Sequence, residues 1–410
     1  MKIDRILAVA ILLIGSSSLN IHLSYAGANG PTLQSLRFED RLITRKLSGV
    51  EFSAATPDIV FSPDGQHVAY LAQISQGQPD AGRWVFVIDD KKTQPFDSRF
   101  STVLFSADSR KFGYSAIRDG RTRIIIDANS VADLTGKVIS VAFSSDLNHY
   151  AYVVTDHDKN IAVIDGNAVG VDNIREILLS SDGVHYLAIA SNHGREYVIQ
   201  DGNRLKGDFE KVTKLNFSPN SKSVAYSAED QGQTIVVFDD KTVRVEAGFG
   251  INPAWSLLFS DDSTRLMYAA WSKDLRHGFV GVMDKLYTCK YGESFGSAAS
   301  LAMSPDNQYL FQAPLFTNRM LINGVPQARA SGSLVSDAVF SPRGNVVAFT
   351  VANGTKQNLA TMRIDSDFVF GPRSPEYDFV SKPIFNVDGT KVAFGVLQGN
   401  EFWWRTLTIG

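Results

Sequence analysis

The stretch Phe61-Ser62-Pro63-Asp64-Gly65, followed by Ala69-Tyr70, is the clearest copy of a pattern that recurs nine times in this 410-residue chain. Each copy has an apolar residue, which we call the anchor, then a turn and a return strand. The anchors lie 36 to 45 residues apart, at Phe61, Phe105, Phe143, Leu179, Phe217, Phe259, Met303, Phe340 and Phe385. A repeat of about forty residues made of strands and turns predicts a β-propeller.

The turn after each anchor has a polar signature. Serine follows the anchor in eight copies, and Asn386 replaces it in the ninth. Seven copies carry aspartate three residues after the anchor, whereas Asn220 substitutes for it and Arg343 breaks the pattern. We expect this side chain to accept hydrogen bonds from downstream amides and so close the first hairpin of each unit. The repeated aspartates, such as Asp64, Asp146 and Asp182, are therefore interpreted as structural.

Two further features complete the repeat. Most return strands place a small residue eight positions after the anchor and an aromatic one nine after it, as in Ala225-Tyr226, which suits a strand packed on both faces. Leu187-Ala188 and Phe311-Gln312 depart from this. A second hairpin follows, with turns such as Asp165-Gly166. The sequence thus predicts an all-β fold of nine four-stranded blades, with eight blades plus a decoration as the alternative.

The two ends of the repeat array predict a closed ring. The last copy finishes with a strand around Phe402–Leu407 and has no fourth strand, while residues Thr44 to Phe52 precede the first copy. We predict that Thr44 to Phe52 complete the final blade and remove an exposed sheet edge. The propeller is then expected over residues 44–410, after a lead segment at 29–43.

Residues 1–28 have the layout of a secretory signal peptide. Lys2 and Arg5 precede an apolar run from Ile6 to Ile14, and small-residue cleavage sites follow at Ser24-Tyr25-Ala26 and Ala26-Gly27-Ala28. Nine apolar residues are too few for a membrane-spanning helix, which needs about 20. We therefore expect export to the periplasm or secretion, with no membrane span after the signal is removed.

Composition excludes several classes of partner and bond. The formal net charge is −3, and no run of five like charges occurs, so nucleic acid is not an expected partner. Cys289 is the only cysteine, so the chain cannot form an intramolecular disulfide. Stability must come from packing, for which 44% hydrophobic residues suffice.

The repeat resembles the WD-like (WD40-like) repeat of TolB-type propellers. The resemblance rests on Phe61–Tyr70, Phe217–Tyr226 and Phe340–Phe349, and it extends over roughly Thr44 to Gly410. It implies an exported propeller, since such repeats serve periplasmic interaction proteins, other exported proteins and the propeller domains of prolyl-oligopeptidase-like peptidases. TolB proteins also have an N-terminal α/β domain and fewer blades, so membership of a Tol–Pal complex is not implied.

No motif indicates a catalytic, cofactor or metal site. Gly292–Gly296 matches the G-x-S-x-G pattern around Ser294, but that motif requires a strand-to-helix turn under an α/β sheet, and here it falls in the blade register. Asp156–Asn160 begins like a calcium loop and lacks the required glycine and terminal glutamate. His157 and His193, on corresponding loops of adjacent blades, have no third ligand to complete a metal site.

Recognition is expected on the face that carries the longer connections, because variable loops on a rigid scaffold usually hold binding residues. These connections are Gln73–Arg83, Asp156–Asn160, Ser191–Glu196, Ser272–Gly278 and Gly248–Trp255. An aromatic group with charges beside it suits a protein or saccharide partner. The alternative is that Trp255 and Trp271 simply cap a blade interface. The candidate partner-binding residues are Trp255, Trp271, Lys273, Asp274, Arg276 and His277.

Three functions remain open from the sequence. The first is an exported, non-catalytic scaffold that binds another envelope or secreted protein or a saccharide. The second is a propeller enzyme, a lyase or hydrolase acting on carbohydrate or peptide, with its site at the mouth of the central channel. The third is a structural role within an envelope complex.

Overall fold

The computed structural model describes most of the repeat array. The described residues are 20–23, 39–52, 58–97, 103–156, 159–245, 249–251, 257–272, 278–283, 285–288, 298–314, 319–329, 334–364 and 368–409. Their secondary structure is entirely β, and no helix occurs in these ranges. Within the same ranges, no helix is long and apolar enough to cross a membrane.

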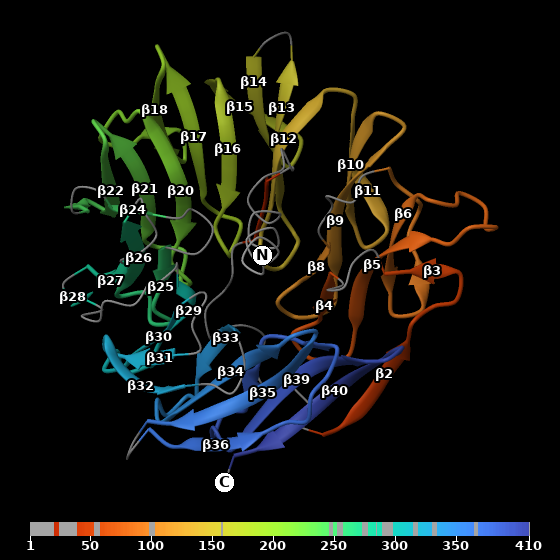
Figure 1. Ribbon diagram of the computed structural model, residues 1–410. Helices are drawn as coiled ribbons and strands as arrows, with labels where there is room; N and C mark the ends of the chain where they lie inside the picture. Colours follow the sequence, from red (N-terminus) through yellow and green to blue (C-terminus); the bar gives the residue numbers. More distant parts are fainter. Residues whose placement is uncertain are drawn as a thin grey trace, which may run out of the picture.

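Nine antiparallel blades form a ring around a central axis (Figure 1). Each blade has four strand positions, ordered from the channel to the rim, and in blades 1, 6 and 9 the innermost position is divided into two short strands. The predicted nine-bladed propeller is therefore confirmed, and no blade is a decoration on a smaller ring.

The strands of each blade are given from the inside outward. Blade 1 consists of β3 (Val50–Glu51) with β4 (Ile59–Phe61), then β5 (Val68–Ile74), β6 (Trp84–Ile88) and β7 (Lys91–Lys92). Blade 2 consists of β8 (Val103–Phe105), β9 (Phe112–Arg118), β10 (Arg121–Ile126) and β11 (Asn129–Leu134). Blade 3 consists of β12 (Lys137–Phe143), β13 (Tyr150–Asp156), β14 (Lys159–Ile164) and β15 (Asn167–Asp172). Blade 4 consists of β16 (Ile174–Leu179), β17 (Tyr186–Asn192), β18 (Arg195–Gln200) and β19 (Asn203–Arg204). Blade 5 consists of β20 (Lys211–Phe217), β21 (Val224–Asp230), β22 (Gln233–Phe238) and β23 (Lys241–Arg244). Blade 6 consists of β24 (Phe249–Ile251) with β25 (Leu257–Phe259), then β26 (Leu266–Ser272), β27 (Gly278–Val282) and β28 (Lys285–Thr288). Blade 7 consists of β29 (Ala298–Met303), β30 (Leu310–Pro314), β31 (Arg319–Ile322) and β32 (Val325–Arg329). Blade 8 consists of β33 (Leu334–Phe340), β34 (Val346–Asn353), β35 (Lys356–Arg363) and β36 (Phe370–Arg373). Blade 9 consists of β37 (Phe379–Val380) with β38 (Ile384–Phe385), then β39 (Lys391–Gln398), β40 (Glu401–Thr408) and β2 (Arg41–Arg45).

The ring closes through its N-terminal part, as predicted, but with different strand bounds. β2 pairs antiparallel with β40 and supplies the outer strand of blade 9. The predicted closing segment, Thr44 to Phe52, was therefore placed too late, because the closing strand is Arg41–Arg45. Val50–Glu51 instead pair with Ile74 and Gln73 in blade 1. The error arose because residues inserted between β3 and β4 break the regular spacing before the anchor.

The hydrophobic core consists of the contacts between neighbouring blades. Anchors and the aromatic residues nine positions later face the preceding blade, whereas the small residues eight positions later face the following one. Tyr70, for example, packs with Phe402 of blade 9, while Ala69 packs with Phe105 of blade 2. Nine clusters among the described residues fall at nine successive interfaces. An open row of nine blades has only eight interfaces, so the clusters themselves require a closed ring.

One additional strand lies on the channel side of blade 3. β1 (Asn20–Leu23) pairs in parallel with β12, from Asn20 opposite Ser140 to Leu23 opposite Phe143. β1 falls inside residues 1–28, for which a cleaved signal peptide is predicted. Cleavage at the predicted sites would remove β1 and leave the channel edge of β12 uncovered.

Candidate functional site

The turns after the anchors use their polar side chains internally. In blade 3 the Ser144 hydroxyl donates to Asp146 at 2.6 Å and accepts the His149 amide at 3.0 Å, and Asp146 also accepts the Asn148 amide at 3.0 Å. In the ninth blade the amide group of Asn386 performs both roles of the serine hydroxyl. Asn345 accepts the serine bond in blade 8, where Arg343 breaks the pattern. The same arrangement occurs in the turns of Ser62, Ser106, Ser180, Ser218, Ser260 and Ser304.

Hydrogen bonds in these turns lower the pKa of Asp262 and also join neighbouring blades. Burial raises the pKa of Asp262, but the hydrogen bonds from Ser260, Thr264 and Asn307 outweigh it and hold that pKa at about 2. The Asp64 amide donates to Ser109 of the next blade at 3.0 Å. On this face of the disc, which we call the turn face, polar side chains therefore close the turns and join several neighbouring blades.

The opposite face, which we call the loop face, is more irregular, but less so than the sequence suggests. The nine-residue connection Ser75–Arg83 joins β5 to β6, and Arg83 forms ion pairs with Asp97 at 3.3 Å and Asp119 at 3.1 Å. The prediction of a long loop at Ser191–Glu196 is wrong, because strand pairing continues to Asn192 and Arg195. Only His193 and Gly194 turn there, both with positive φ.

Most of the predicted partner-binding residues lie outside the described residues. This holds for Trp255, Lys273, Asp274, Arg276 and His277, and also for His157. Trp271 belongs to β26, where its main chain pairs with Gly250 on one side and Gly278 on the other. The backbone thus places Gly250, Trp271 and Gly278 side by side at one end of blade 6.

The residue three positions before each anchor carries a signal that the sequence prediction missed. It is polar in all nine copies, at Asp58, Thr102, Ser140, Glu176, Lys214, Ser256, Ser300, Asp337 and Lys382. Among the described inner strands, two serines at this position bond to the next blade, whereas Asp337 accepts from Ser336 and Thr350 of its own blade. The hydroxyl of Ser140 accepts the Ile177 amide at 3.3 Å, and that of Ser300 accepts the Ala338 amide at 2.9 Å. A search for polar positions at a fixed offset from the anchor would have found this ring.

Blades 4 and 5 place charges at this inner position. Burial lowers the pKa of Lys214, and the negative charge of Glu176 opposes that shift. Beside them, Arg175 binds both carboxylate oxygens of Glu196, at 2.9 and 3.0 Å. Arg175 also donates to the Val212 carbonyl at 2.6 Å, so it fastens blade 4 to the inner strand of blade 5. No group of three or more metal-ligating side chains occurs in the described ranges.

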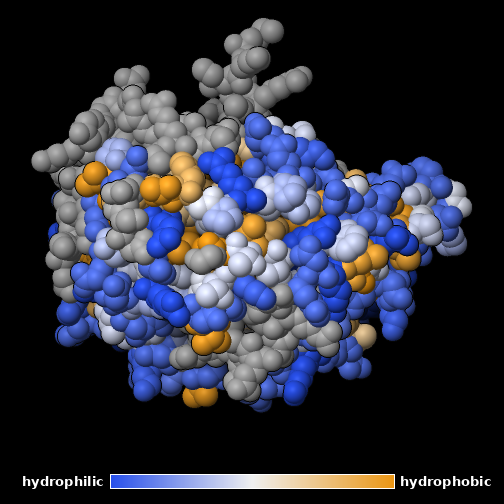
Figure 2. Space-filling model, turned by 90° about the horizontal axis from the view of Figure 1, so that it is seen from below, coloured by the Kyte–Doolittle hydropathy of each residue, from blue (hydrophilic) through white to orange (hydrophobic). Residues whose placement is uncertain are grey.

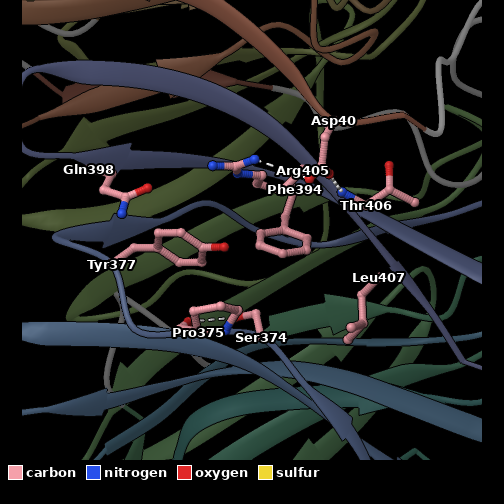
Figure 3. A pocket seen from close by; sticks show the side chains of 9 residues that line it. All are labelled: Asp40, Ser374, Pro375, Tyr377, Phe394, Gln398, Arg405, Thr406 and Leu407. Atoms are coloured by element: carbon pink, nitrogen blue, oxygen red, sulfur yellow. Dashed lines mark hydrogen bonds and ion pairs between the residues drawn. The ribbon is translucent and has the colours of Figure 1, made fainter.

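A pocket of about 320 Å³ lies between blade 9 and the connection that enters it from blade 8 (Figure 3). We call it the seam pocket. Asp40, just before β2, accepts the Thr406 amide at 2.9 Å and pairs with Arg405 at 3.0 Å. In Figure 3, Tyr377 and Phe394 lie between Arg405 on one side and Ser374 on the other. Its polar lining consists of Asp40, Ser374, Tyr377, Gln398, Arg405 and Thr406.

No protein-family model and no curated protein matches the chain. Among solved structures, the Dos1 propeller is 11% identical, with a TM-score of 0.45 over 93% of this chain and 97% of that one. A structure titled as the eukaryotic initiation factor is 10% identical, with a TM-score of 0.45 over 90% and 94%. Hsv2 of Kluyveromyces lactis is 12% identical, with a TM-score of 0.37 over 66% and 97%. These likenesses carry no argument about function, and the class of the protein, a nine-bladed β-propeller, follows from its own sheets.

Proposed function

We propose that this propeller is an exported, non-catalytic scaffold that binds another envelope or secreted protein, or a saccharide, through its loop face. The proposal rests on a difference between the two faces of the disc: side chains of the turn face bond to one another, whereas the connections of the loop face vary in length. On the turn face, serine, aspartate and asparagine side chains are used in closing the turns and joining the blades. On the loop face, connections range from two residues at His193-Gly194 to nine at Ser75–Arg83. Connections of different length on a rigid scaffold are typical of recognition surfaces.

The part of the rim on the side of blades 8 and 9 offers a poorer surface for a large partner. Figure 2 shows the edge of the disc from below, the side on which blades 8 and 9 lie in Figure 1. Hydrophobic residues there form small groups separated by hydrophilic ones. Protein interfaces that rely on apolar contact require larger continuous patches. The proposal therefore assigns partner binding to the loop face.

Within the loop face, we place the contact at blade 6. Two large aromatic residues and both signs of charge occur in this part of the sequence, at Trp255, Trp271, Lys273, Asp274, Arg276 and His277. Of these, Trp271 lies near the end of β26, where its main chain pairs with Gly250 and Gly278. Tryptophan and arginine dominate the binding energy of many protein interfaces. We expect Trp271→Ala to weaken partner binding about tenfold or more.

The test is quantitative crosslinking in the native cell envelope and culture fluid, comparing wild type with Trp271→Ala and Trp255→Ala. Val184→Ser is the matched control, because Val184 is 71% exposed on the turn face of blade 4. We expect a partner that is recovered with wild type and Val184→Ser and lost with the tryptophan variants. Equal recovery by all four proteins would contradict the proposal.

Export has its own measurement, N-terminal sequencing of the protein from the periplasm or medium. We expect a mature chain that begins after Ala26 or Ala28. A chain that keeps Met1 and stays in the cytoplasm would exclude the proposed compartment.

A further inference from the structure

The innermost strand of each blade has one edge toward the channel, and in blade 3 a further strand is added to that edge (Figure 1). β1 pairs in parallel with β12 over four residues, with Ile21 opposite Val141 and His22 opposite Ala142. Since β13 pairs with the other edge of β12, β1 extends the sheet of blade 3 into the channel, where it also lies beside β16 of blade 4. The channel edge of β12 can therefore bind an extended chain through main-chain hydrogen bonds.

Two features of β12 suit it to an added strand. It is continuous over seven residues, whereas the inner positions of blades 1, 6 and 9 are divided into two short strands. Its residue three positions before the anchor is Ser140, whose short side chain is directed to blade 4, where its hydroxyl accepts the Ile177 amide at 3.3 Å. β16 and β20 have the longer, charged Glu176 and Lys214 at the same position. An added strand therefore meets a continuous edge in β12, and the first residue that it pairs with is small.

Removal of β1 would leave main-chain groups of β12 without their strand partners. Adjacent residues of a strand direct their N–H and C=O groups to opposite edges, so every second residue of Ser140–Phe143 faces the position of β1. An open sheet edge of this kind is a ready template for another extended chain. Cleavage after Ala26 or Ala28 would vacate the edge, because β1 ends at Leu23.

We propose that the channel edge of β12 is a strand-addition site, which β1 occupies in the unprocessed chain and an extended segment of a partner protein occupies after processing. The inference rests on the proposed export, because processing is the event that removes β1. The partner segment runs parallel to β12 over at least four residues and has no proline where its main chain donates to β12. Asn20–Leu23 contains no lysine, arginine, aspartate or glutamate, so a segment without these residues fits the site.

The test uses a fluorescein-labelled peptide of the sequence Ser18–Tyr25 as the probe and measures its binding by fluorescence anisotropy. The protein is isolated from the periplasm or medium, and its N-terminus is sequenced. We expect saturable binding with a dissociation constant between about 10 and 300 µM. The matched control peptide carries Ile21→Pro and His22→Pro. Because consecutive residues donate to opposite edges, one of the two prolines removes a donor to β12, and binding should be at least about tenfold weaker.

The full-length chain tests the same edge independently of export. Full-length wild type should bind the probe at least about tenfold more weakly than the processed chain, because β1 already occupies the edge at high effective concentration. Full-length Ile21→Pro/His22→Pro should regain binding, whereas the control Ser16→Pro/Ser17→Pro, which leaves β1 intact, should not.

Three results would overturn the strand-addition site. They are no saturable binding to the processed chain up to about 1 mM probe, equal binding of the proline peptide, and equal binding by the full-length wild type and its Ile21→Pro/His22→Pro variant. If sequencing shows that the isolated chain keeps Met1, the export proposal fails, and the full-length variants alone decide whether the edge binds a strand. The partner contact proposed at blade 6 does not depend on any of these results.

Discussion

Gly65→Ala tests ring closure directly, because Gly65 lies where the first blade meets the last. Its φ is +68°, a region in which an L-residue costs about 1–2 kcal/mol. A Cβ atom at this position would lie 2.2 Å from two ring atoms of Trp404 in blade 9. Trp404 is only 1% exposed and cannot move into solvent, so the overpacking adds about 1–3 kcal/mol. The turn is also held in place, since Arg41 of the closing strand donates to the Gly65 carbonyl at 2.5 Å.

The expected total is a loss of about 2–5 kcal/mol in the free energy of unfolding. Gly166→Ala is the matched control, because its φ is +82° and no atom lies within 4 Å of the added Cβ, which leaves only the backbone cost of about 1–2 kcal/mol. Gly183→Ala should fall between them, since its Cβ would meet the ring of His149, whose side chain is 42% exposed and can move.

Urea unfolding of the three variants, followed by circular dichroism, measures these differences as shifts in midpoint at constant slope. Adding Trp404→Phe to Gly65→Ala should recover part of the loss, so that the two costs are not additive. If Gly65→Ala is no more destabilising than Gly166→Ala, blade 9 does not pack on the first turn of blade 1, and closure through β2 is refuted.

The polar turns yield two further predictions. Ser144→Ala removes both the donor to Asp146 and the acceptor for the His149 amide, so it should cost about 1–3 kcal/mol in urea unfolding, whereas Ser130→Ala at the exposed edge of blade 2 should change little. Because the folded-state pKa of Asp262 is depressed to about 2, its contribution to stability is fully present above its ordinary pKa of 3.8 and is lost as the pH falls through 2. Asp262→Asn should therefore be less stable than wild type at pH 7, with a difference that shrinks between pH 4 and 2 in acid-unfolding curves; a constant difference would contradict the assignment.

The repeat made the fold predictable because each blade carries its own local instructions. The anchor, the serine and the aspartate act within six residues of one another, and the hydrogen bonds of Ser144 and Asp146 are those that the pattern implies. The alternation of Ala69 and Tyr70 likewise predicted packing on both faces, and the two residues do belong to different interfaces. Local rules repeated nine times leave little freedom in the choice of architecture.

Other features could not be predicted, because they depend on exceptions to the repeat. The bounds of the closing strand were wrong since Phe52 shares its offset from the anchor with outer-strand aromatics, although the segment Val50–Glu51 belongs to the inner strand of blade 1. The length of the Ser191–Glu196 connection was overestimated because strand pairing continues to Asn192 and Arg195. In the sequence, the polar residues at these strand ends resemble a loop. In the structure, His193 and Gly194 both have positive φ, which allows a tight two-residue turn.

The seam pocket shows most clearly why a site can be invisible in a repeat sequence. Its residues come from position 40 and from positions 374 to 407, which no local motif connects. The other eight blades draw all four strands from one continuous stretch of chain, and only the ninth takes its outer strand from the opposite end. Pairing with that strand begins at Trp404 and does not include Arg405, and the Asp40 carboxylate takes the place of a paired strand by accepting the Thr406 amide.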